Sequence, residues 1–530
     1  MNKKRNFRVS MLSLVLLLSL TPALCSGGNM GDFTADVSIS TTYLHEWMPS
    51  IAYNPIENEF MVLWHTTGVR EPGGENMYSL HGQRVSPEGE LTGAPFSPLL
   101  SIGPGRRILP KPAYNIFTNQ YMVAFCMEQP ETTWDPFVTR IDHDGTILSD
   151  PIPLSEQPPK ANHPFIAFNS VRRQYLIAYN DSRNGDHDIF GVIVDENGNV
   201  VKEDFSICTA VGQQQNPYIS YNPTDDTYLM NWEDFRHVPT WTENGDIYGA
   251  LLDGDGNMLV SDIPMCDDYG MDNEGGQWLN NIAYNPDRNE FLVCWFDTRP
   301  TLNLTGIVGR FFSADGTPAG PDFTLADAPG AQLWSNLVYI QEKKMYFLVW
   351  MDERNSEIDE DWSDSDNWDI YAKWLSPSGE SIGPDIPLCT AERSQTYPVA
   401  AYSPVEDRLL IAWRDELEED VPSGTGSGHV TESGGNIMGK VYGVPSFFSG
   451  RVVEQGSGEP VEGASVTVVG LGYERTVMSN IGGWFNLPER FQSIGNYVAV
   501  IRKKGYLKAI ETSIYKGEPL KITVELNKKE

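Results

Sequence analysis

Short apolar runs alternate with polar turns along most of the chain. Residues 163–209 illustrate the pattern, because the apolar runs HPFIAF, RQYLIAY, IFGVIVD and EDFSICT are separated by polar segments that include the tight turn ENGN. Runs of this length that are rich in β-branched and aromatic residues, with Asn, Asp and Gly between them, are typical of antiparallel strands. The segment therefore predicts a meander of four strands.

The same four-run unit recurs seven times. Its first run reads MPSIAYNP, KPAYNI, HPFIAFNS, NPYISYNP, LNNIAYNP, WSNLVYI and YPVAAYSP. One aromatic residue marks each copy, at spacings of 53 to 63 residues: Tyr53, Tyr114, Phe168, Tyr221, Tyr284, Tyr339 and Tyr402. Repeats of four strands with a period of this order indicate the blades of a β-propeller.

The two ends of the repeat region complement each other. Residues 37–43, VSISTTY, resemble the fourth run of later units, whereas the last unit stops after its third run at residues 436–444. An N-terminal strand that completes the last blade would remove the weak seam of the ring. We predict an all-β protein in which residues 33–444 form a seven-bladed β-propeller closed by its N-terminal strand.

A second domain follows the segment PSFFSG at residues 445–450. The chain carries a formal net charge of −34, but residues 445–530 hold 11 basic and 9 acidic residues, so the acidity lies almost entirely before this segment. Such a change of character predicts a domain boundary. The overall acidity also argues against nucleic acid as a partner.

The C-terminal segment contains GRVVEQGSGEPVEGASVTVVG, then SNIGGWFNLP, then NYVAVIRKKGY. This pattern resembles the carboxypeptidase regulatory-like family, which implies a small transthyretin-like β-sandwich over residues 447–530 that serves as an accessory module. Ser479 stands where the family usually has Thr. The alternating apolar residues Ala464, Val466 and Val468 independently predict a strand. The resemblance implies no peptidase activity, because no His follows the HVTE segment to complete a zinc site.

Residues 1–25 have the layout of a secretory signal, with Lys3, Lys4 and Arg5 before an apolar run. The mature protein is therefore expected outside the cell or on its surface, and no later run is long enough for a membrane-spanning helix. Cys25 is a candidate lipid anchor, although Leu24 before it is bulkier than lipoprotein signals prefer, so free secretion stays open. The other cysteines are odd in number and lie in apolar runs, which favours buried thiols.

A loop at residues 179–191, YNDSRNGDHDIFG, resembles a cluster of catalytic or metal-binding groups. Its aromatic-x-Asp-x-Arg pattern recurs in three further units, which favours a structural device repeated once per blade. An Asp also precedes the next run at Asp188, Asp246 and Asp369, so we expect each Arg to fork back onto it. The expected structural pairs are Asp181 with Arg183, Asp234 with Arg236, Asp297 with Arg299, and Asp352 with Arg354.

The long, unequal connections of a propeller lie on one face, where function is expected. Tryptophans in or beside these connections are candidates, because an aromatic face stacks on the C–H patches of sugars and also suits protein partners. Packing between loops is the alternative for each ring. The candidate ligand-binding residues are Trp47, Trp134, Trp241, Trp278, Trp334, Trp362 and Trp368.

An acidic insertion, NSEIDEDWSDSDNWD, makes calcium a candidate ion, although the Gly and Glu of a calcium loop are missing and a solvated acidic loop explains the residues equally well. Its candidate ligands are Asp359, Asp361, Asp364 and Asp366. No complete catalytic motif occurs. We therefore expect noncatalytic binding of an extracellular glycan or protein. The alternative is a polysaccharide lyase or hydrolase whose acidic residues come from several blades.

Overall fold

The computed structural model describes residues 32–34, 36–40, 45–67, 79–97, 107–128, 134–155, 161–237, 245–266, 276–299, 301–303, 305–356, 367–416, 435–443, 448–471, 473–487, 495–515 and 520–529. Every regular element in these ranges is a β-strand. The expectation of an all-β fold is therefore confirmed. No described segment is a helix that could cross a bilayer.

Each repeat of the sequence forms an antiparallel meander with its strands in chain order. The third repeat forms β11 (Ala161–Asn169), β12 (Gln174–Asp181), β13 (Asp188–Asp195) and β14 (Val200–Cys208). Every residue of β12 is buried, which explains its almost continuous apolar run. The corresponding sheets are β3 (His45–Asn54), β4 (Glu59–Thr67), β5 (Ser79–Val85) and β6 (Leu91–Phe96); β7 (Arg107–Asn115), β8 (Gln120–Glu128), β9 (Trp134–Asp142) and β10 (Ile152–Pro153); β15 (Gln214–Asn222), β16 (Thr227–Asp234), β17 (Asp246–Asp253) and β18 (Met258–Pro264); β19 (Gln277–Asn285), β20 (Glu290–Asp297), β21 (Gly306–Ser313) and β22 (Phe323–Ala326); and β23 (Gln332–Ile340), β24 (Met345–Asp352), β25 (Asp369–Leu375) and β26 (Ser381–Cys389).

The last repeat contributes β27 (Gln395–Ser403), β28 (Arg408–Glu416) and β29 (Gly435–Gly443). The outer edge of β29 pairs antiparallel with β1 (Asp32–Phe33) and β2 (Val37–Ser38) from the start of the chain. The pairing is shorter than the expected strand at residues 37–43, of which residues 41–43 lie outside the described ranges. Both ends of the repeat region thus contribute to one sheet, which a single parallel pair also joins to β3.

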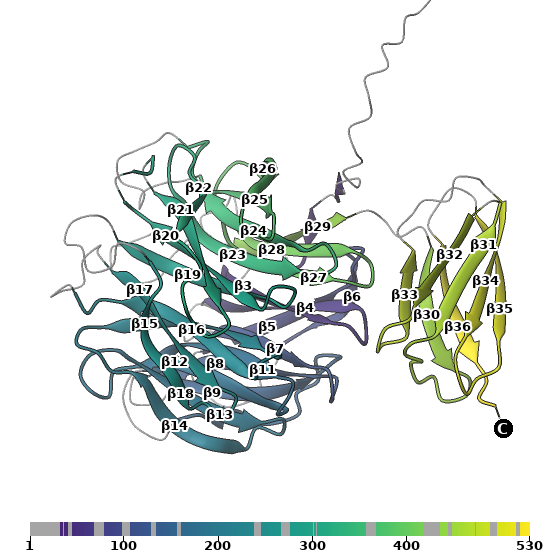
Figure 1. Ribbon diagram of the computed structural model, residues 1–530, viewed down its shortest axis with the longest axis horizontal. Coiled ribbons are helices and arrows are strands. Elements are labelled where there is room, and N and C mark those ends of the chain that lie inside the picture. Colours follow the sequence, from purple (N-terminus) through teal and green to yellow (C-terminus); the bar gives the residue numbers. More distant parts are fainter. Residues whose placement is uncertain are drawn as a thin grey trace, which may run out of the picture.

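The first strand of each repeat lies at the centre, against the first strands of its two neighbours, and β27 contacts β3. The sheets therefore form a closed ring, visible on the left of Figure 1. Hydrophobic clusters lie between neighbouring sheets; Leu176 of β12, for example, packs with Tyr228 and Trp232 of β16. A ring of radial four-stranded sheets with their cores between them is a β-propeller.

Polar groups link neighbouring sheets at the turns that follow the innermost strands. The Asn54 carboxamide oxygen accepts the N–H groups of Ile56 and Glu57, while its nitrogen donates to Asn119 Oδ1 of the next sheet at 2.9 Å. At the point of closure, Ser403 Oγ donates to Asn58 Oδ1 at 3.0 Å. These bonds satisfy buried turn groups and fix the spacing of the sheets.

The strands after Gly443 belong to two further sheets, on the right of Figure 1. They share one hydrophobic core, in which Ala464, Val466 and Val468 are fully buried. One sheet contains β30 (Phe448–Glu454), β33 (Trp484–Leu487) and β36 (Leu520–Leu526), and the other contains β31 (Ser465–Gly470), β32 (Tyr473–Met478), β34 (Gly495–Arg502) and β35 (Ala509–Tyr515).

This C-terminal unit contacts the propeller at the turn that follows β3. Trp484 Nε1 donates to the carbonyl oxygen of Ile56 at 2.9 Å, and Lys521 Nζ lies 3.2 Å from Glu88 Oε1. The Arg451 guanidinium lies over the Trp484 ring at 5.2 Å. The unit therefore sits on the short-turn side of the propeller, away from the long connections.

Candidate functional site

Every innermost strand of the propeller carries a β-bulge at the same position, where the pairing with its second strand shifts register. The bulged residue has a positive φ, between 47° and 59°, in all seven strands. A bulge re-aims side chains at the cost of backbone strain. The residues with positive φ are Met48, Leu109, His163, Asn216, Leu279, Trp334 and Tyr397.

These bulges direct a set of side chains into the centre of the ring. The position two residues after each bulged residue is different in almost every blade: Ser50, Lys111, Phe165, Tyr218, Asn281, Asn336 and Val399. The bulge is therefore a device common to all blades, whereas the side chains around it are specific to each blade. Such blade-specific residues are the expected carriers of function in a repeat protein.

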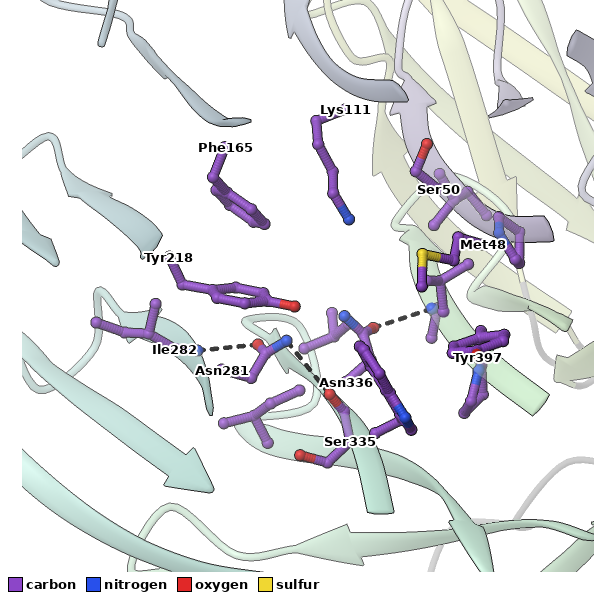
Figure 2. Close-up of a pocket in the computed structure, with 18 of the residues that line it drawn as sticks. Met48, Ser50, Lys111, Phe165, Tyr218, Asn281, Ile282, Ser335, Asn336 and Tyr397 are labelled. Carbon is purple, nitrogen blue, oxygen red and sulfur yellow. Dashed lines mark hydrogen bonds between the residues drawn. The ribbon is translucent and has the colours of Figure 1, made fainter. Parts of the chain in front are cut away.

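A cavity of about 280 Å³ lies at the centre, lined by residues of all seven innermost strands. Four aromatic residues from four blades contribute to its wall: Phe165, Tyr218, Trp334 and Tyr397. The Trp334 and Tyr397 rings meet edge to face at 5.0 Å, and the Phe165 and Tyr218 rings lie 4.5 Å apart. Figure 2 shows the Tyr218 hydroxyl and the Lys111 ammonium pointing into this space.

A smaller cavity of about 80 Å³ adjoins the first and is lined by His163, Asn216 and Glu233. Glu233 is 3% exposed and accepts two hydrogen bonds, from the Leu279 N–H to Oε1 and from Asn216 Nδ2 to Oε2, both at 2.9 Å. Burial raises the pKa of this carboxyl to about 7, although both hydrogen bonds act in the opposite direction. Glu233 therefore lines the smaller cavity, and its carboxyl changes charge near neutral pH.

The ionisation of Glu233 should make folding stability depend on pH. Because its pKa is about 4.5 in the unfolded chain and about 7 in the folded one, the folded state binds the extra proton between these values. The contribution of Glu233 to stability is then greatest below pH 4.5 and falls by about 1.4 kcal/mol per pH unit as the pH rises to 7. In Glu233→Gln this contribution disappears, so we expect the variant to gain stability relative to the native chain across that window.

Urea denaturation of both proteins at pH 5, 6, 7 and 8 measures the difference. The exposed Glu203→Gln controls for the loss of one negative charge. A Glu233→Gln difference that stays constant from pH 5 to pH 7 would contradict the raised pKa.

Burial lowers the pKa of three basic side chains near the centre. Burial lowers the pKa of Lys111 to about 8, and burial together with the charge of Lys111 lowers the pKa of His163 to about 4 and of His65 to about 3. Both imidazoles are therefore neutral at pH 7, and Lys111 supplies the positive charge of the cavity wall. Arg414 of β28 lies outside the lining of both cavities, with its guanidinium 4.1 Å from the centre of the Trp47 ring.

Three of the expected tryptophans lie in innermost strands, where Trp47 and Trp278 directly precede a bulged residue and Trp334 is itself one. Trp47 and Trp334 both contact Tyr397, and Trp278 stacks on Phe296 at 5.5 Å. Of these three, Trp334 lines the cavity. Trp134 begins β9 and is partly buried. Trp241 and Trp362 lie outside the described residues.

Trp368 is 7% exposed and belongs to a hydrophobic core cluster with Ile370 and Trp413. Its ring therefore has almost no surface for a ligand, and the sequence could not distinguish this packing from exposure in a loop. The candidate calcium ligands Asp359, Asp361, Asp364 and Asp366 lie outside the described residues. Within the described ranges, no cluster of three or more His, Cys, Asp or Glu side chains has the arrangement of a metal site.

The recurring Asp and Arg residues form ion pairs. The Arg183, Arg236, Arg299 and Arg354 guanidinium groups lie 2.5 to 2.7 Å from Asp181, Asp234, Asp297 and Asp352, respectively. The expected second carboxylates Asp188, Asp246 and Asp369 were wrong, because the second partners of the four Arg residues are acids of the outermost strands or of the turns that lead into them. These partners are Asp204, Asp262, Asp322 and Asp385.

Asp188, Asp246 and Asp369 accept hydrogen bonds from Asn184, His237 and Asn355 instead. A signal for the true partners exists in the sequence, since the fourth runs EDFS, SDIP, PDFT and PDIP carry an Asp in the same four blades that carry the Arg. Each Arg thus connects the second strand of its blade to the outermost one.

The sequence patterns did not identify four residues that line the two cavities: Lys111, Tyr218, Glu233 and Tyr397. A signal existed for their location, because Pro follows the bulged residue in five of the seven first runs, as in MPS, LPK, HPF, NPY and YPV. A recurring Pro inside a predicted strand marks a bulge. What the sequence could not give was which side chains would meet across the ring.

The fold and the site define a β-propeller with a small, aromatic-lined central cavity. No protein-family model and no curated protein matches the chain. The chain is similar to a solved protein of unknown function from Dyadobacter fermentans, with 12% identity over 78% of this chain and 99% of that one and a TM-score of 0.44. It is also similar to the phage phi92 endosialidase, with 10% identity over 78% and 69% of the chains and a TM-score of 0.42.

A third similar structure is the β-propeller domain of the trilobed protease from Pyrococcus furiosus, with 10% identity over 70% and 89% of the chains and a TM-score of 0.39. Similarities of this level do not assign a function. The resemblance of residues 447–530 to the carboxypeptidase regulatory-like family also stays a prediction.

Proposed function

We propose that this chain is a noncatalytic binding protein that takes one sugar unit of an extracellular glycan into the central cavity of a seven-bladed propeller. The observation that carries the proposal is the convergence of Phe165, Tyr218, Trp334 and Tyr397 on one space. Aromatic faces stack on the apolar C–H patches of a sugar ring, and amide groups such as Asn281 and Asn336 hydrogen-bond to hydroxyls.

The size of the cavity limits the ligand. About 280 Å³ is just below the ~300–1,000 Å³ typical of small-molecule sites. Such a volume suits a terminal or single sugar unit better than a stretch of polymer. We expect further units to contact Trp241 and Trp362, the two candidate rings outside the described residues.

The proposal also includes the export signal, the two domains and the calcium ion that the sequence predicts. Residues 1–25 would direct export, with Cys25 as a candidate anchor to the cell surface. Residues 33–444 would form the propeller, and residues 447–530 would be a transthyretin-like module that presents it. Calcium bound by Asp359, Asp361, Asp364 and Asp366 would stabilise one long connection.

An extracellular polysaccharide-active enzyme is the second candidate, and Glu233 is the observation that favours it. A carboxyl with a pKa near 7 beside a cavity is suited to general acid or base catalysis. Glycoside hydrolysis normally needs a second carboxyl within about 5 to 10 Å. Among the described residues that line the two cavities, Glu233 is the only acidic one, and both its oxygens accept hydrogen bonds.

The test is migration of the mature protein through native gels cast with neutral and acidic polysaccharides. Retarded migration over intact polymer supports the proposal, and cleared polymer supports the enzyme. We expect Trp334→Ala to weaken binding about tenfold, because it removes a stacking surface worth about 1.4 kcal/mol. The control is Phe117→Ala, whose exposed ring lies on the short-turn side, 6.2 Å from Phe168. Equal retardation of both variants would contradict the cavity as the site, and binding to no polymer would favour a protein ligand.

A further inference from the structure

Lys111 is the only charged residue among those that line the larger cavity. It lies in β7 two residues after the bulge at Leu109, and no other blade has a charged residue at this position. Because structural devices recur in every blade, a residue type that occurs once at a repeated position is the pattern expected of function.

The ammonium group of Lys111 makes no hydrogen bond and no ion pair with any residue that the structure describes. Nζ makes a cation–π contact with the Phe165 ring, whose centroid lies 5.7 Å away. Lys111 is partly exposed to this cavity, and charged groups inside proteins are normally paired with an opposite charge. The cavity therefore presents a positive charge that none of its described residues neutralises.

Two further hydrogen-bond donors face the same space. The Tyr218 hydroxyl points into the cavity (Figure 2) and has no partner within the described part of the chain. Asn336 uses its Oδ1 to accept the Ala400 N–H at 3.0 Å, which leaves its amide nitrogen available to a ligand. No Asp or Glu is among the residues that line this cavity, so its described wall presents donors and one positive charge but no anionic acceptor.

We propose that the central cavity selects a sugar unit that carries an anionic group, a carboxylate or a sulfate, and that Lys111 binds this group. The inference rests on the proposed glycan-binding function and specifies the class of its ligand. In the complex, the Lys111 ammonium, the Tyr218 hydroxyl and the Asn336 amide donate to the anion and the neighbouring hydroxyls. The rings of Trp334 and Tyr397 pack on the sugar. Charge-assisted hydrogen bonds in a site sheltered from water are the strong ones.

Because the protein as a whole is acidic, the salt dependence of binding distinguishes an ion pair with Lys111 from nonspecific binding of an anion. The chain has a formal net charge of −34, so its field repels anions at long range. Salt screens such long-range repulsion, since the Debye length is about 10 Å at 0.1 M, but screens a buried ion pair much less. Raising the salt concentration from 0.05 to 0.5 M should therefore leave the affinity for an anionic sugar unchanged or increase it, whereas nonspecific binding of an anion by surface cations would weaken.

The experiment is calorimetric titration of the full mature chain with three short oligosaccharides of the same backbone, ending in glucose, glucuronic acid or glucose 6-sulfate. We expect the anionic ligand to bind at least about tenfold more tightly than the neutral one, as for a hydrogen bond to a charged group. Lys111→Met should abolish that preference while leaving the neutral ligand's affinity within about twofold. Lys202→Met, which removes the same charge from β14, should change neither value, and Lys111→Arg should retain the preference.

The outcomes separate this inference from the function on which it rests. If the neutral and anionic ligands bind equally, or if Lys111→Met keeps the preference, the role of Lys111 is wrong and glycan binding stands. If none of the three ligands binds while the protein is folded by circular dichroism, both proposals fail together. Tighter binding of the glucuronic acid ligand than of the sulfated one identifies the anion as a carboxylate, and the reverse identifies it as a sulfate.

Discussion

A chain that begins at Thr41 should lose a large part of its thermal stability, because it lacks the N-terminal segment that completes the closing sheet. In the native protein, Thr34 N donates to Val441 O at 2.9 Å and Ile39 N donates to Ile437 O at 2.9 Å. Without residues 32–40, β29 becomes an open edge with unpaired backbone groups.

Side chains of the same segment contribute as well. Ile39 is 2% exposed in the cluster between the first and last sheets. Ser40 Oγ donates to Glu46 Oε1, and the other oxygen of this buried carboxylate accepts the Ile437 N–H at 2.9 Å. Truncation therefore removes one partner of a buried charge together with a core side chain. Each loss alone costs a few kcal/mol.

The point variant Ile39→Asn isolates the core contribution and should destabilise the protein by about 2–5 kcal/mol. Ser38→Asn is the matched control, since Ser38 directly precedes Ile39 and is exposed. Thermal unfolding at one fixed scan rate compares all proteins. A truncated chain that melts within a degree or two of the native one would mean that the ring closes through β3 and β27 alone.

Replacing Asp234 by Ala should destabilise the propeller by about 3–5 kcal/mol, as expected when one partner of a buried ion pair is removed. The Asp234 carboxylate is 1% exposed and accepts hydrogen bonds from the side chains of Trp232 and Arg236 and from the Arg236 N–H. Its loss leaves the indole N–H and much of the guanidinium without an acceptor. The Arg236 guanidinium also lies 4.0 Å from the centre of the Tyr248 ring, so the change should disturb the third strand as well.

Asp262→Ala is the matched control, because Asp262 pairs with the same Arg236 at 2.8 Å but is 54% exposed. Exposed pairs contribute only about 0 to 1 kcal/mol, so this variant should remain close to the native protein. Urea denaturation of both variants measures the two losses. Similar losses would indicate that Arg236 acts mainly through its outer partner, and the assignment of Asp234 as the buried anchor would be wrong.

The repeat pattern made the propeller predictable. Apolar runs such as RQYLIAY become fully buried second strands because a strand with a sheet neighbour on each side and cores on both faces has no exposed position. The recurrence of Asp-x-Arg in four units also identified the Asp181 and Arg183 type of pair, since side chains two residues apart around a turn can meet whatever surrounds them. The expected second partners failed because Asp204 and its equivalents lie on strands that only the folded sheet brings close.

The sequence predicted that tryptophans would contribute to the candidate site, but it did not predict where in the blades they would lie. Trp47, Trp278 and Trp334 were expected in or beside loops. They lie at or next to the bulges of innermost strands, whose positive φ values no single run of the sequence requires. Lys111 and Glu233 are residue types that usually lie on the surface, and no motif in the sequence marks either of them. Their burial beside one space follows from the closure of the ring.

The sequence by itself determined the strands, their number per repeat, the polar turns and the ends that meet in one sheet. These features depend on local patterning, and patterning repeats along the chain. The tertiary structure alone decided the central cavity. Its wall takes residues from seven strands between Met48 and Tyr397, and successive strands are about 50 to 60 positions apart in the sequence. The wall also brings the Lys111 ammonium close to the Phe165 ring. Such a juxtaposition depends on the closure of the ring, which leaves no linear motif.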